Sequence, residues 1–312
     1  MTNTPDVEPP SRFRGCLLGL AAGDAVGTAV EFKPRGSFPP VTEMTGGGPF
    51  NLNPGEWTDD TSMALCLATS LVETGSFDPR DQMTRYLRWR KEGYLSATGR
   101  CFDIGNTVSG ALGRFERSGE PYSGSADPGS AGNGSLMRLA PVPMFFHPDE
   151  GAARAYAAES SRTTHGAAEC VDACGFFAGV LFRALSGADK DDVLLADAAT
   201  FSGEPAIAAV ARGEYREKAA HKIRGSGYVV HCLEAALWAF HHSESFADAI
   251  LLATNLGEDT DTTAAVCGQV AGAYYGESGI PVRWLERLAM RAEIARLAEA
   301  LYHANQNERG RP

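Results

Sequence analysis

Apolar residues in this chain recur at the three- and four-residue spacing of an amphipathic α-helix over most of its length. No region alternates apolar and polar residues for long enough to predict a paired β-strand. We therefore expect an all-α fold. The helices predicted from the spacing cover residues 13–22, 62–73, 80–92, 107–117, 151–161, 167–185, 229–239, 245–254, 262–275 and 281–302.

A single compact domain is expected over residues 12–305, because no segment between them resembles a linker. The 312 residues, 44% of them hydrophobic, are enough to bury a full core. The polar ends, 1–11 and 306–312, are predicted to be flexible tails. No apolar run approaches the roughly 18 residues of a membrane-spanning helix, and the first residues lack the apolar segment of a signal peptide. These features predict a cytoplasmic protein.

The charge and the cysteines narrow the class further. A net charge of −11 disfavours a general nucleic-acid or membrane-surface binder, because either partner would meet a surface of like charge. A small anionic ligand stays possible, since bound cations can reverse a local field. The seven cysteines are odd in number and form no CxxC pair, so we expect them to be reduced and structural.

Two adjacent carboxylates open a predicted helix in the segment GEWTDDTSM, where Thr58, Asp59 and Asp60 fall before or in the first turn. One carboxylate can cap the helix, an interaction worth about 1 kcal/mol. The second is repelled by its neighbour unless it gains a cation, and a hard divalent metal ion with oxygen ligands relieves that repulsion. The segment therefore predicts metal ligands, with ordinary helix capping as the alternative.

A similar segment, GEDTDTT, precedes the helix AAVCGQVAGAYYG. Residues spaced by two face the same side of an extended approach, which selects Asp259 and Asp261 as a pair and turns Glu258 elsewhere. Thr262 adds a hydroxyl oxygen. Both segments offer only hard oxygen ligands, which favours Mg²⁺ or Mn²⁺ over Zn²⁺ and makes a two-metal site plausible.

Other residues could serve a reaction beside such a site. Glu31 follows an apolar, small-residue stretch in which a carboxylate would be poorly solvated, so its pKa could be raised for acid–base work. Asp24, in the same stretch, is expected to be a buried turn or capping residue. Asp103 precedes another predicted helix, where capping is the alternative role. His165 is expected to orient a loop more than to act as a base.

Three long glycine-rich loops, 34–55, 119–134 and 203–227, separate the predicted helices. Loops of this length inside a compact domain are usually functional or disordered. The second ends in a small-residue turn whose backbone N–H groups could hold a phosphate. This signal is weak alone, because it matches neither the dinucleotide fingerprint nor the P-loop.

The motifs, taken together and in order, resemble those of the ADP-ribosylglycohydrolase family, and most closely its dinitrogenase reductase-activating glycohydrolase branch. The motifs are GLAAGDAVGTAVEF from Gly19, MTGGG from Met44, TDDTSM from Thr58, DIGNT from Asp103, AGNGSLMR from Ala131, THG from Thr164, GYVVHCLEAALWAF from Gly227 and DTDTT from Asp259. They span nearly the whole chain.

The resemblance implies a compact, single-domain helical fold with a cleft that binds two Mg²⁺ or Mn²⁺ ions. The implied metal ligands are Thr58, Asp59, Asp60, Asp259, Asp261 and Thr262, the residues that spacing also selected. Asp103 would act on the distal ribose or its leaving group, and Glu31 would lie close to the metals. The ADP-ribose site would be lined by Gly132, Asn133, Gly134 and Ser135, with His165 at the same cleft.

The implied activity is hydrolysis of the N-glycosidic bond that joins ADP-ribose to a protein side chain, with arginine as the preferred acceptor. The substrate would be an ADP-ribosylated protein and the product ADP-ribose. Two departures from the family pattern, Glu258 and His231, could alter the choice of acceptor.

Several alternatives stay open from the sequence. The acceptor could be serine or another O-linked side chain, and the chain could be a catalytically silent ADP-ribose binder. A two-metal phosphoesterase would share the acids but leave Asp103 and the AGNG loop without a role. Finally, both acidic segments could be helix caps in a metal-free structural protein.

Overall fold

The computed structural model describes the backbone of residues 5–308 and the side chains of residues 5–304. The described chain is helical, and its only β-pairing is three isolated bridges. The expected all-α fold is therefore confirmed. The helices are α1 (Pro9–Gly27), α2 (Asp59–Thr74), α3 (Pro79–Glu92), α4 (Asn106–Ser118), α5 (Pro141–Phe146), α6 (Glu150–Arg162), α7 (Ala168–Leu185), α8 (Lys190–Leu195), α9 (Pro205–Ala211), α10 (Val229–His241), α11 (Phe246–Thr254), α12 (Thr260–Tyr275), α13 (Val282–Arg287) and α14 (Arg291–Glu308), with short 3-10 turns between some of them.

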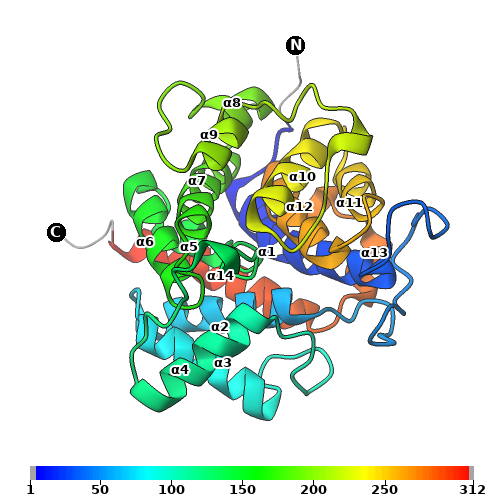
Figure 1. The fold of residues 1–312 in the computed structure, drawn as a ribbon. Helices are drawn as coiled ribbons and strands as arrows, with labels where there is room; N and C mark the ends of the chain where they lie inside the picture. Colours follow the sequence, from blue (N-terminus) through cyan, green and yellow to red (C-terminus); the bar gives the residue numbers. More distant parts are fainter. Residues whose placement is uncertain (1–4, 309–312) are drawn as a thin grey trace.

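Helices α1 and α12 form the centre of the molecule and are buried along almost their whole length (Figure 1). Glycines let the two backbones touch: a Cβ at Gly19 would lie 2.4 Å from the Gly268 carbonyl oxygen, and one at Gly15 would lie 2.3 Å from that of Gly272. Further along the contact, a Cβ at Gly23 would lie 2.1 Å from the Ala264 oxygen. This close approach brings the end of α1 against the beginning of α12.

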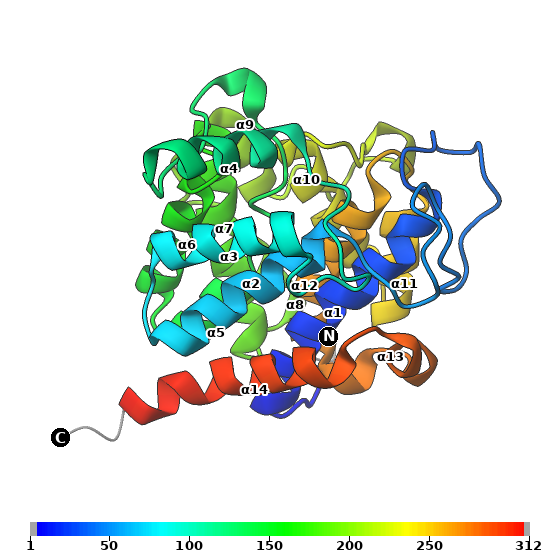
Figure 2. The same ribbon diagram turned by 90° about the horizontal axis from the view of Figure 1, so that it is seen from below.

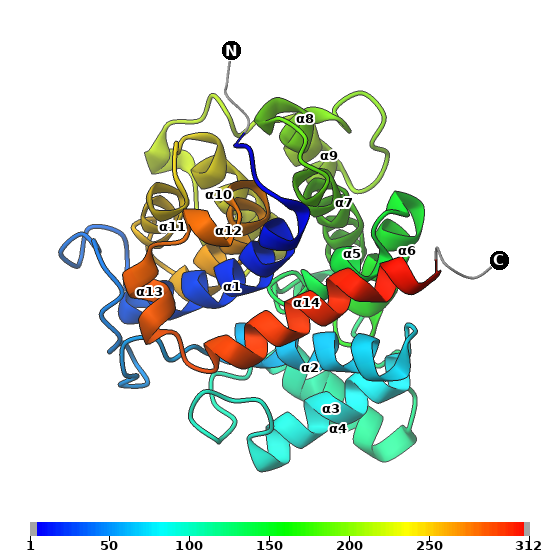
Figure 3. The same cartoon turned by 180° about the vertical axis from the view of Figure 1, so that it is seen from behind.

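The remaining helices surround this central pair. Helix α14 packs across α1, α2 and α5, and runs along one edge of the molecule in Figure 2. From behind, α14 crosses between α1 and α2 (Figure 3). Helices α10 and α11 pack against the other side of α12, and α7 also contacts it. The beginnings of α2 and α12 therefore lie inside the molecule.

Some predicted boundaries were wrong. The single helix expected over 281–302 is two helices, α13 and α14, separated at Met290, whose φ of 55° is left-handed. Helix α9 lies within the expected loop 203–227, and α5 and α8 were also missed. These helices have six or seven residues, and so short a segment gives too few turns for an apolar periodicity to be recognised.

The ends of the chain and its most apolar helix bear on two other expectations. Helix α1 begins at Pro9 and α14 ends at Glu308, so parts of the expected tails 1–11 and 306–312 are helical; residues 1–4 and 309–312 lie outside the described residues. The stretch Pro9–Val30 is long and apolar enough to pass for a membrane span, which the sequence reading did not anticipate. Within it, an 18-residue apolar window is 89% buried inside the molecule, as is typical of a core helix.

Candidate active site

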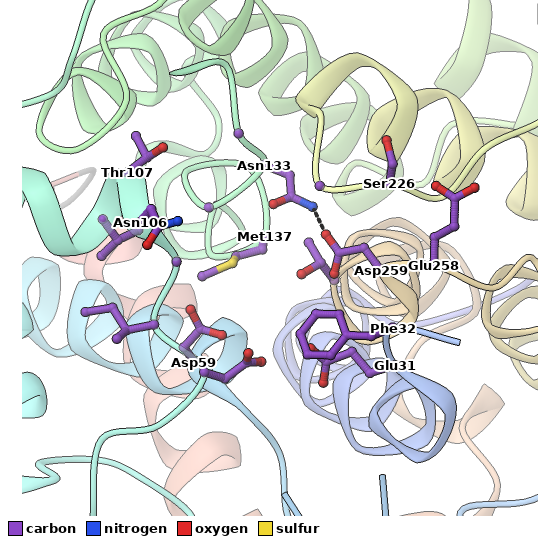
Figure 4. A pocket seen from close by; sticks show the side chains of 18 of the residues that line it. Glu31, Phe32, Asp59, Asn106, Thr107, Asn133, Met137, Ser226, Glu258 and Asp259 are labelled. Carbon is purple, nitrogen blue, oxygen red and sulfur yellow. Dashed lines mark hydrogen bonds between the residues drawn. The ribbon is translucent and has the colours of Figure 1, made fainter. Parts of the chain in front are cut away.

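A cavity of about 820 Å³ opens where the beginnings of α2, α4 and α12 meet the glycine-rich loop 131–135 (Figure 4). Ligand sites for small organic molecules typically span roughly 300–1,000 Å³. The sequence-predicted residues on its wall are Glu31, Asp59, Asp103, Gly132, Asn133, Gly134, His165, Asp259 and Thr262.

The start of α2 is capped by an acid from another helix. Asp24 of α1 accepts hydrogen bonds from the Thr58 amide and hydroxyl at 2.9 and 3.0 Å, and from the Thr61 amide and hydroxyl at 3.1 and 2.6 Å. The prediction that Asp24 is a buried capping residue is therefore confirmed. Because Asp24 accepts hydrogen bonds from free amides at the start of α2, neither Asp59 nor Asp60 is needed to cap this helix.

The start of α12 is held in a different way. Asp259 stands at the N-cap position without capping through its side chain, and its Oδ2 accepts a 2.7 Å hydrogen bond from the Asn133 amide nitrogen. Asp261 follows in the first turn and is 1% exposed. The side chain of Asn133 thus links the glycine-rich loop to the acids of α12.

The two acidic segments, 203 residues apart, converge on one another. Thr58 Oγ1 lies 3.2 Å from Asp60 Oδ2 and 3.2 Å from Asp261 Oδ2. Thr262 Oγ1 lies 3.3 Å from the same Asp60 oxygen. Thr58, Asp60 and Asp261 lie buried beneath the cavity wall, while Asp59 and Asp259 reach it. The segments that the sequence paired by similarity therefore form one carboxylate cluster.

Two further acids join this cluster. Glu31 follows α1 and Asp103 precedes α4, and ligand oxygens of Glu31, Asp103 and Asp261 lie within 4.8 Å of one another, a spacing that could hold a metal ion. Asp103 adopts a left-handed φ of 58°, a backbone conformation that costs energy for a residue other than glycine. Such strain is common at functional sites.

Burial raises the pKa of every acid in the cluster. For Glu31, burial and the nearby charge of Asp103 raise the pKa to about 10. Burial raises the pKa of Asp103 to about 7, and it raises the pKa of Asp259 as well. Burial and neighbouring carboxylates raise the pKa of Asp59, Asp60 and Asp261 well above the usual range for aspartate. A cation among them would stabilise the charged forms.

Unsatisfied oxygen atoms provide an independent test of whether a cation fits. Glu31 Oε2, Asp60 Oδ1 and Asp261 Oδ1 are buried without a hydrogen-bond partner among the described residues. Leaving a buried acceptor unsatisfied costs about 1–3 kcal/mol, and more for a charged group. The atoms of the cluster that could bind a metal ion are carboxylate and hydroxyl oxygens, the ligands that hard divalent cations prefer. The residues present therefore fit a divalent metal ion.

The glycine-rich loop rests on His165. This side chain is 2% exposed, and its Nδ1 lies 2.8 Å from the Thr164 hydroxyl. A Cβ at Gly134 would lie 2.9 Å from the His165 ring, so only glycine fits there without displacing the ring. Burial lowers the pKa of His165 to about 3, so the ring is neutral. This placement agrees with a supporting role for His165.

Ser135 is a further predicted site residue that does not line the cavity. Its side chain is 2% exposed, and its hydroxyl accepts a 2.9 Å hydrogen bond from Ser161 behind the loop. Several residues of the cavity wall were not among the predicted site residues. These are Phe32, Pro34, Ile104, Gly105, Asn106, Thr107, Val108, Met137, Ser226, Gly227 and Glu258.

The helical fold thus places a buried carboxylate cluster that could hold a metal ion beneath a cavity of ligand size. The comparison with known proteins agrees. The ADP-ribosylglycohydrolase family model matches residues 4–311. An ADP-ribosylarginine hydrolase of Pseudomonas putida is 48% identical, covering 96% of this chain and 80% of the relative.

A second relative and a solved structure extend the agreement. An ADP-ribosyl-[dinitrogen reductase] glycohydrolase of Rhodospirillum rubrum is 31% identical, covering 93% of this chain and 95% of the relative. A solved chain titled "ADP-ribosylglycohydrolase-related protein complex" has a TM-score of 0.85 and 46% identity, covering 95% of this chain and 99% of that one. This chain belongs to the ADP-ribosylglycohydrolase family, and it is a glycosyl hydrolase.

Proposed function

We propose that this chain hydrolyses the N-glycosidic bond between ADP-ribose and an arginine side chain of a modified protein. The products are ADP-ribose and unmodified arginine. The observation that carries the proposal is the convergence of two buried acidic helix starts beneath a cavity large enough for ADP-ribose. The names of the relatives from Pseudomonas putida and Rhodospirillum rubrum support it.

The cluster is proposed to hold two Mg²⁺ or Mn²⁺ ions. The ligands are Thr58, Asp59, Asp60, Asp259, Asp261 and Thr262, with Glu31 and Asp103 close enough to contribute. When bound, such ions supply positive charge that orients ribose hydroxyls and makes a nearby water more acidic. The absence of nitrogen and sulfur from this donor set favours Mg²⁺ or Mn²⁺ over Zn²⁺.

The protein's own groups manage the substrate and its protons. Gly132 and Gly134 present backbone to the ADP-ribose, and Asn133 holds Asp259 in place. In the reaction the bond from the anomeric carbon to nitrogen breaks and a water oxygen takes its place. Asp103 or Glu31 accepts a water proton, and the departing guanidine nitrogen gains one.

The setting of the reaction follows from the same features. The substrate is an ADP-ribosylated protein, and no nucleic acid or membrane is required. We propose that residues 12–305 carry the whole activity and that the protein works in the cytoplasm. A silent ADP-ribose binder would have no need of the complete set of acids.

The test incubates the purified protein with an ADP-ribosyl-arginine protein and, separately, with an ADP-ribosyl-serine peptide, and measures free ADP-ribose. We expect release from the arginine substrate with Mg²⁺ and none with a chelator. Release from the serine peptide alone would reassign the acceptor. No release from either substrate would leave a binder and overturn the proposal.

A further inference from the structure

Two residues at the cavity, Phe32 and Glu258, share an unusual backbone conformation. Their φ angles are 62° and 69°, in the left-handed region that glycine adopts without strain. Both residues line the cavity. For a bulky residue such as phenylalanine this conformation is a genuine outlier, so something must compensate for its cost.

The backbone holds these two residues side by side. The Phe32 amide donates to the Glu258 carbonyl oxygen at 2.8 Å, and the Glu258 amide donates to the Lys33 carbonyl oxygen at 2.8 Å. Arg35 fixes the same contact, because its Nε donates to the Leu256 carbonyl oxygen at 2.7 Å. The segments that follow α1 and precede α12 are therefore tied together at Phe32 and Glu258.

Core packing does not explain why these side chains are present. Phe32 is 64% exposed, and the Glu258 side chain is 37% exposed. A large aromatic ring that stays in solvent on a strained backbone gains little from the hydrophobic effect of folding. Figure 4 shows the Phe32 ring beside Glu31 at the cavity, and the Glu258 carboxylate turned away from that of Asp259. Both side chains are available to a ligand.

The Glu258 carboxylate already binds a guanidinium group. Arg224 donates to it from Nη2 at 3.0 Å and from Nε at 3.4 Å. The Arg224 side chain is 59% exposed, so solvent weakens this pair. A second guanidinium that arrives through the cavity could replace Arg224 at little cost.

The charges of the cavity wall favour a cationic occupant at this place. Its wall carries five acidic residues and no lysine or arginine among the residues that line it: Glu31, Asp59, Asp103, Glu258 and Asp259. Bound metal ions would offset the negative charges of four of these acids: Glu31, Asp59, Asp103 and Asp259. The charge of Glu258 is balanced among the described residues by Arg224, whose side chain is 59% exposed.

We propose that Phe32 and Glu258 form the acceptor subsite, in which the target arginine stacks on the Phe32 ring and bonds to Glu258. A planar cation is attracted both to an aromatic face and to a carboxylate that can accept two parallel hydrogen bonds. Arg224 occupies the carboxylate until the substrate displaces it. This inference rests on the proposed arginine hydrolysis and names the residues that recognise the acceptor.

The test compares KM for an ADP-ribosyl-arginine protein with Kd for ADP-ribose alone. In Glu258→Gln we expect KM to rise about tenfold, because a charged hydrogen-bond acceptor becomes neutral, while Kd for ADP-ribose stays unchanged. In Arg224→Gln we expect KM to fall, because the competing guanidinium is gone. The matched control is Glu214→Gln, which breaks the exposed pair with Arg212, 2.8 Å apart and away from the cavity, and should change neither constant.

Phe32→Gly separates recognition from folding. Glycine relieves the left-handed strain, so Tm should be equal or higher, while KM for the arginine substrate rises. If Phe32 served only the fold, Phe32→Gly would lower Tm, and a higher KM would then accompany a less stable protein. Calorimetric titration with agmatine in the presence of ADP-ribose adds a readout that needs no turnover, and we expect weaker agmatine binding in both Phe32→Gly and Glu258→Gln.

Specific outcomes would overturn the inference. An unchanged KM and unchanged agmatine binding in Glu258→Gln would remove it, even if arginine hydrolysis itself is established. Weaker ADP-ribose binding in Phe32→Gly and Glu258→Gln would assign the pair to the ADP-ribose end of the ligand. Absence of turnover in the wild-type protein would refute the proposed function instead, and agmatine binding would still report on the subsite.

Discussion

Helices α3, α6 and α8 begin in solvent-accessible positions, whereas α2 and α12 begin inside the molecule, and acids stand at all five starts. At the accessible starts, Asp78, Asp149 and Asp189 accept hydrogen bonds from amides of their own helices at 2.8–3.0 Å. At the buried starts, neither Thr58 nor Asp259 caps through its side chain. The same sequence signal thus describes two different structures.

What separates the two kinds is the source of the cap and the burial of the acids, because the accessible starts also carry further acids in their first turns: Asp81, Glu150, Asp191 and Asp192. Asp24 from α1 takes over the capping of α2, which leaves Asp59 and Asp60 free of that task. At each accessible start a single carboxylate caps and remains hydrated. A helix start with surplus acids that burial keeps from water therefore indicates a cation site.

The largest expected difference is in catalysis. Asp261→Ala removes a proposed metal ligand from the buried start of α12, and we expect kcat/KM to fall about 1,000-fold, the loss of several kcal/mol of transition-state stabilisation. The measurement is the initial rate of ADP-ribose release at saturating Mg²⁺.

Asp149→Ala is the matched change at an accessible start. It should lower the free energy of unfolding by about 1 kcal/mol and leave kcat/KM within about twofold of the wild type at 25 °C. Equal losses of activity in the two variants would erase the distinction between buried and accessible starts.

The same substitution at the two kinds of cap should also change the free energy of unfolding by different amounts. Asp24→Asn places amide hydrogens against the donors of Thr58 and Thr61, so we expect the free energy of unfolding to fall by about 3 kcal/mol. Asp189→Asn should be nearly neutral, since asparagine is as good an N-cap as aspartate. Urea denaturation with Mg²⁺ present measures both. A neutral Asp24→Asn would show that Asp24 does not organise the α2 start.

A smaller effect concerns the contact that brings the buried starts together. A Cβ at Gly268 would lie 2.1 Å from the Gly19 carbonyl oxygen, so Gly268→Ala should force α1 and α12 apart and cost about 2 kcal/mol. Gly110→Ala, on an exposed face of α4, should instead stabilise by about 0.5–1 kcal/mol. Thermal unfolding measures both, and the account fails here if Gly268→Ala is also stabilising.

The last effect is a pH dependence at His165, which supports the loop that contacts the α12 start. Burial lowers the pKa of His165 to about 3, while the unfolded chain takes up that proton near pH 6.5. Between these pH values the unfolded state binds more protons, so stability is full above pH 6.5 and falls as pH decreases, by at most about 1.4 kcal/mol per pH unit.

His165→Gln should reduce this slope, which urea denaturation at several pH values between 4 and 7 measures. An identical slope in the wild type and the variant would mean that the His165 ring takes up its proton at the same pH in the folded and unfolded chains, and would contradict the expectation. The comparison is made at constant Mg²⁺ so that the carboxylate cluster contributes equally to both curves.

The sequence predicted the helices and the acidic site residues better than it predicted how they are arranged in space. Asp59 and Asp261 stand beside apolar helical patterns that a reader can find directly. That Thr58 meets Asp261 across 203 residues depends on the glycine contact between α1 and α12, which spacing alone does not reveal. Likeness between the two acidic segments, and resemblance to a family, supplied the missing link.

Other features had no signal that a single sequence could carry. Ser135 lies within a run of loop residues, yet its side chain turns behind the loop to Ser161. Phe32 looks like a core residue because it is aromatic, but its left-handed backbone exposes the ring. The break at Met290 lies within an uninterrupted helical pattern. Each depends on tertiary contacts that override local preference.

The most direct test of the account is to count the divalent ions that the protein binds, by the loss of the free Mn²⁺ electron paramagnetic resonance signal on titration with protein. We predict about two ions per wild-type chain, the same number in Asp149→Ala, and weakened binding in Asp261→Ala. A wild-type protein that leaves the Mn²⁺ signal unchanged would show that the buried acidic starts hold no metal, and would contradict the account.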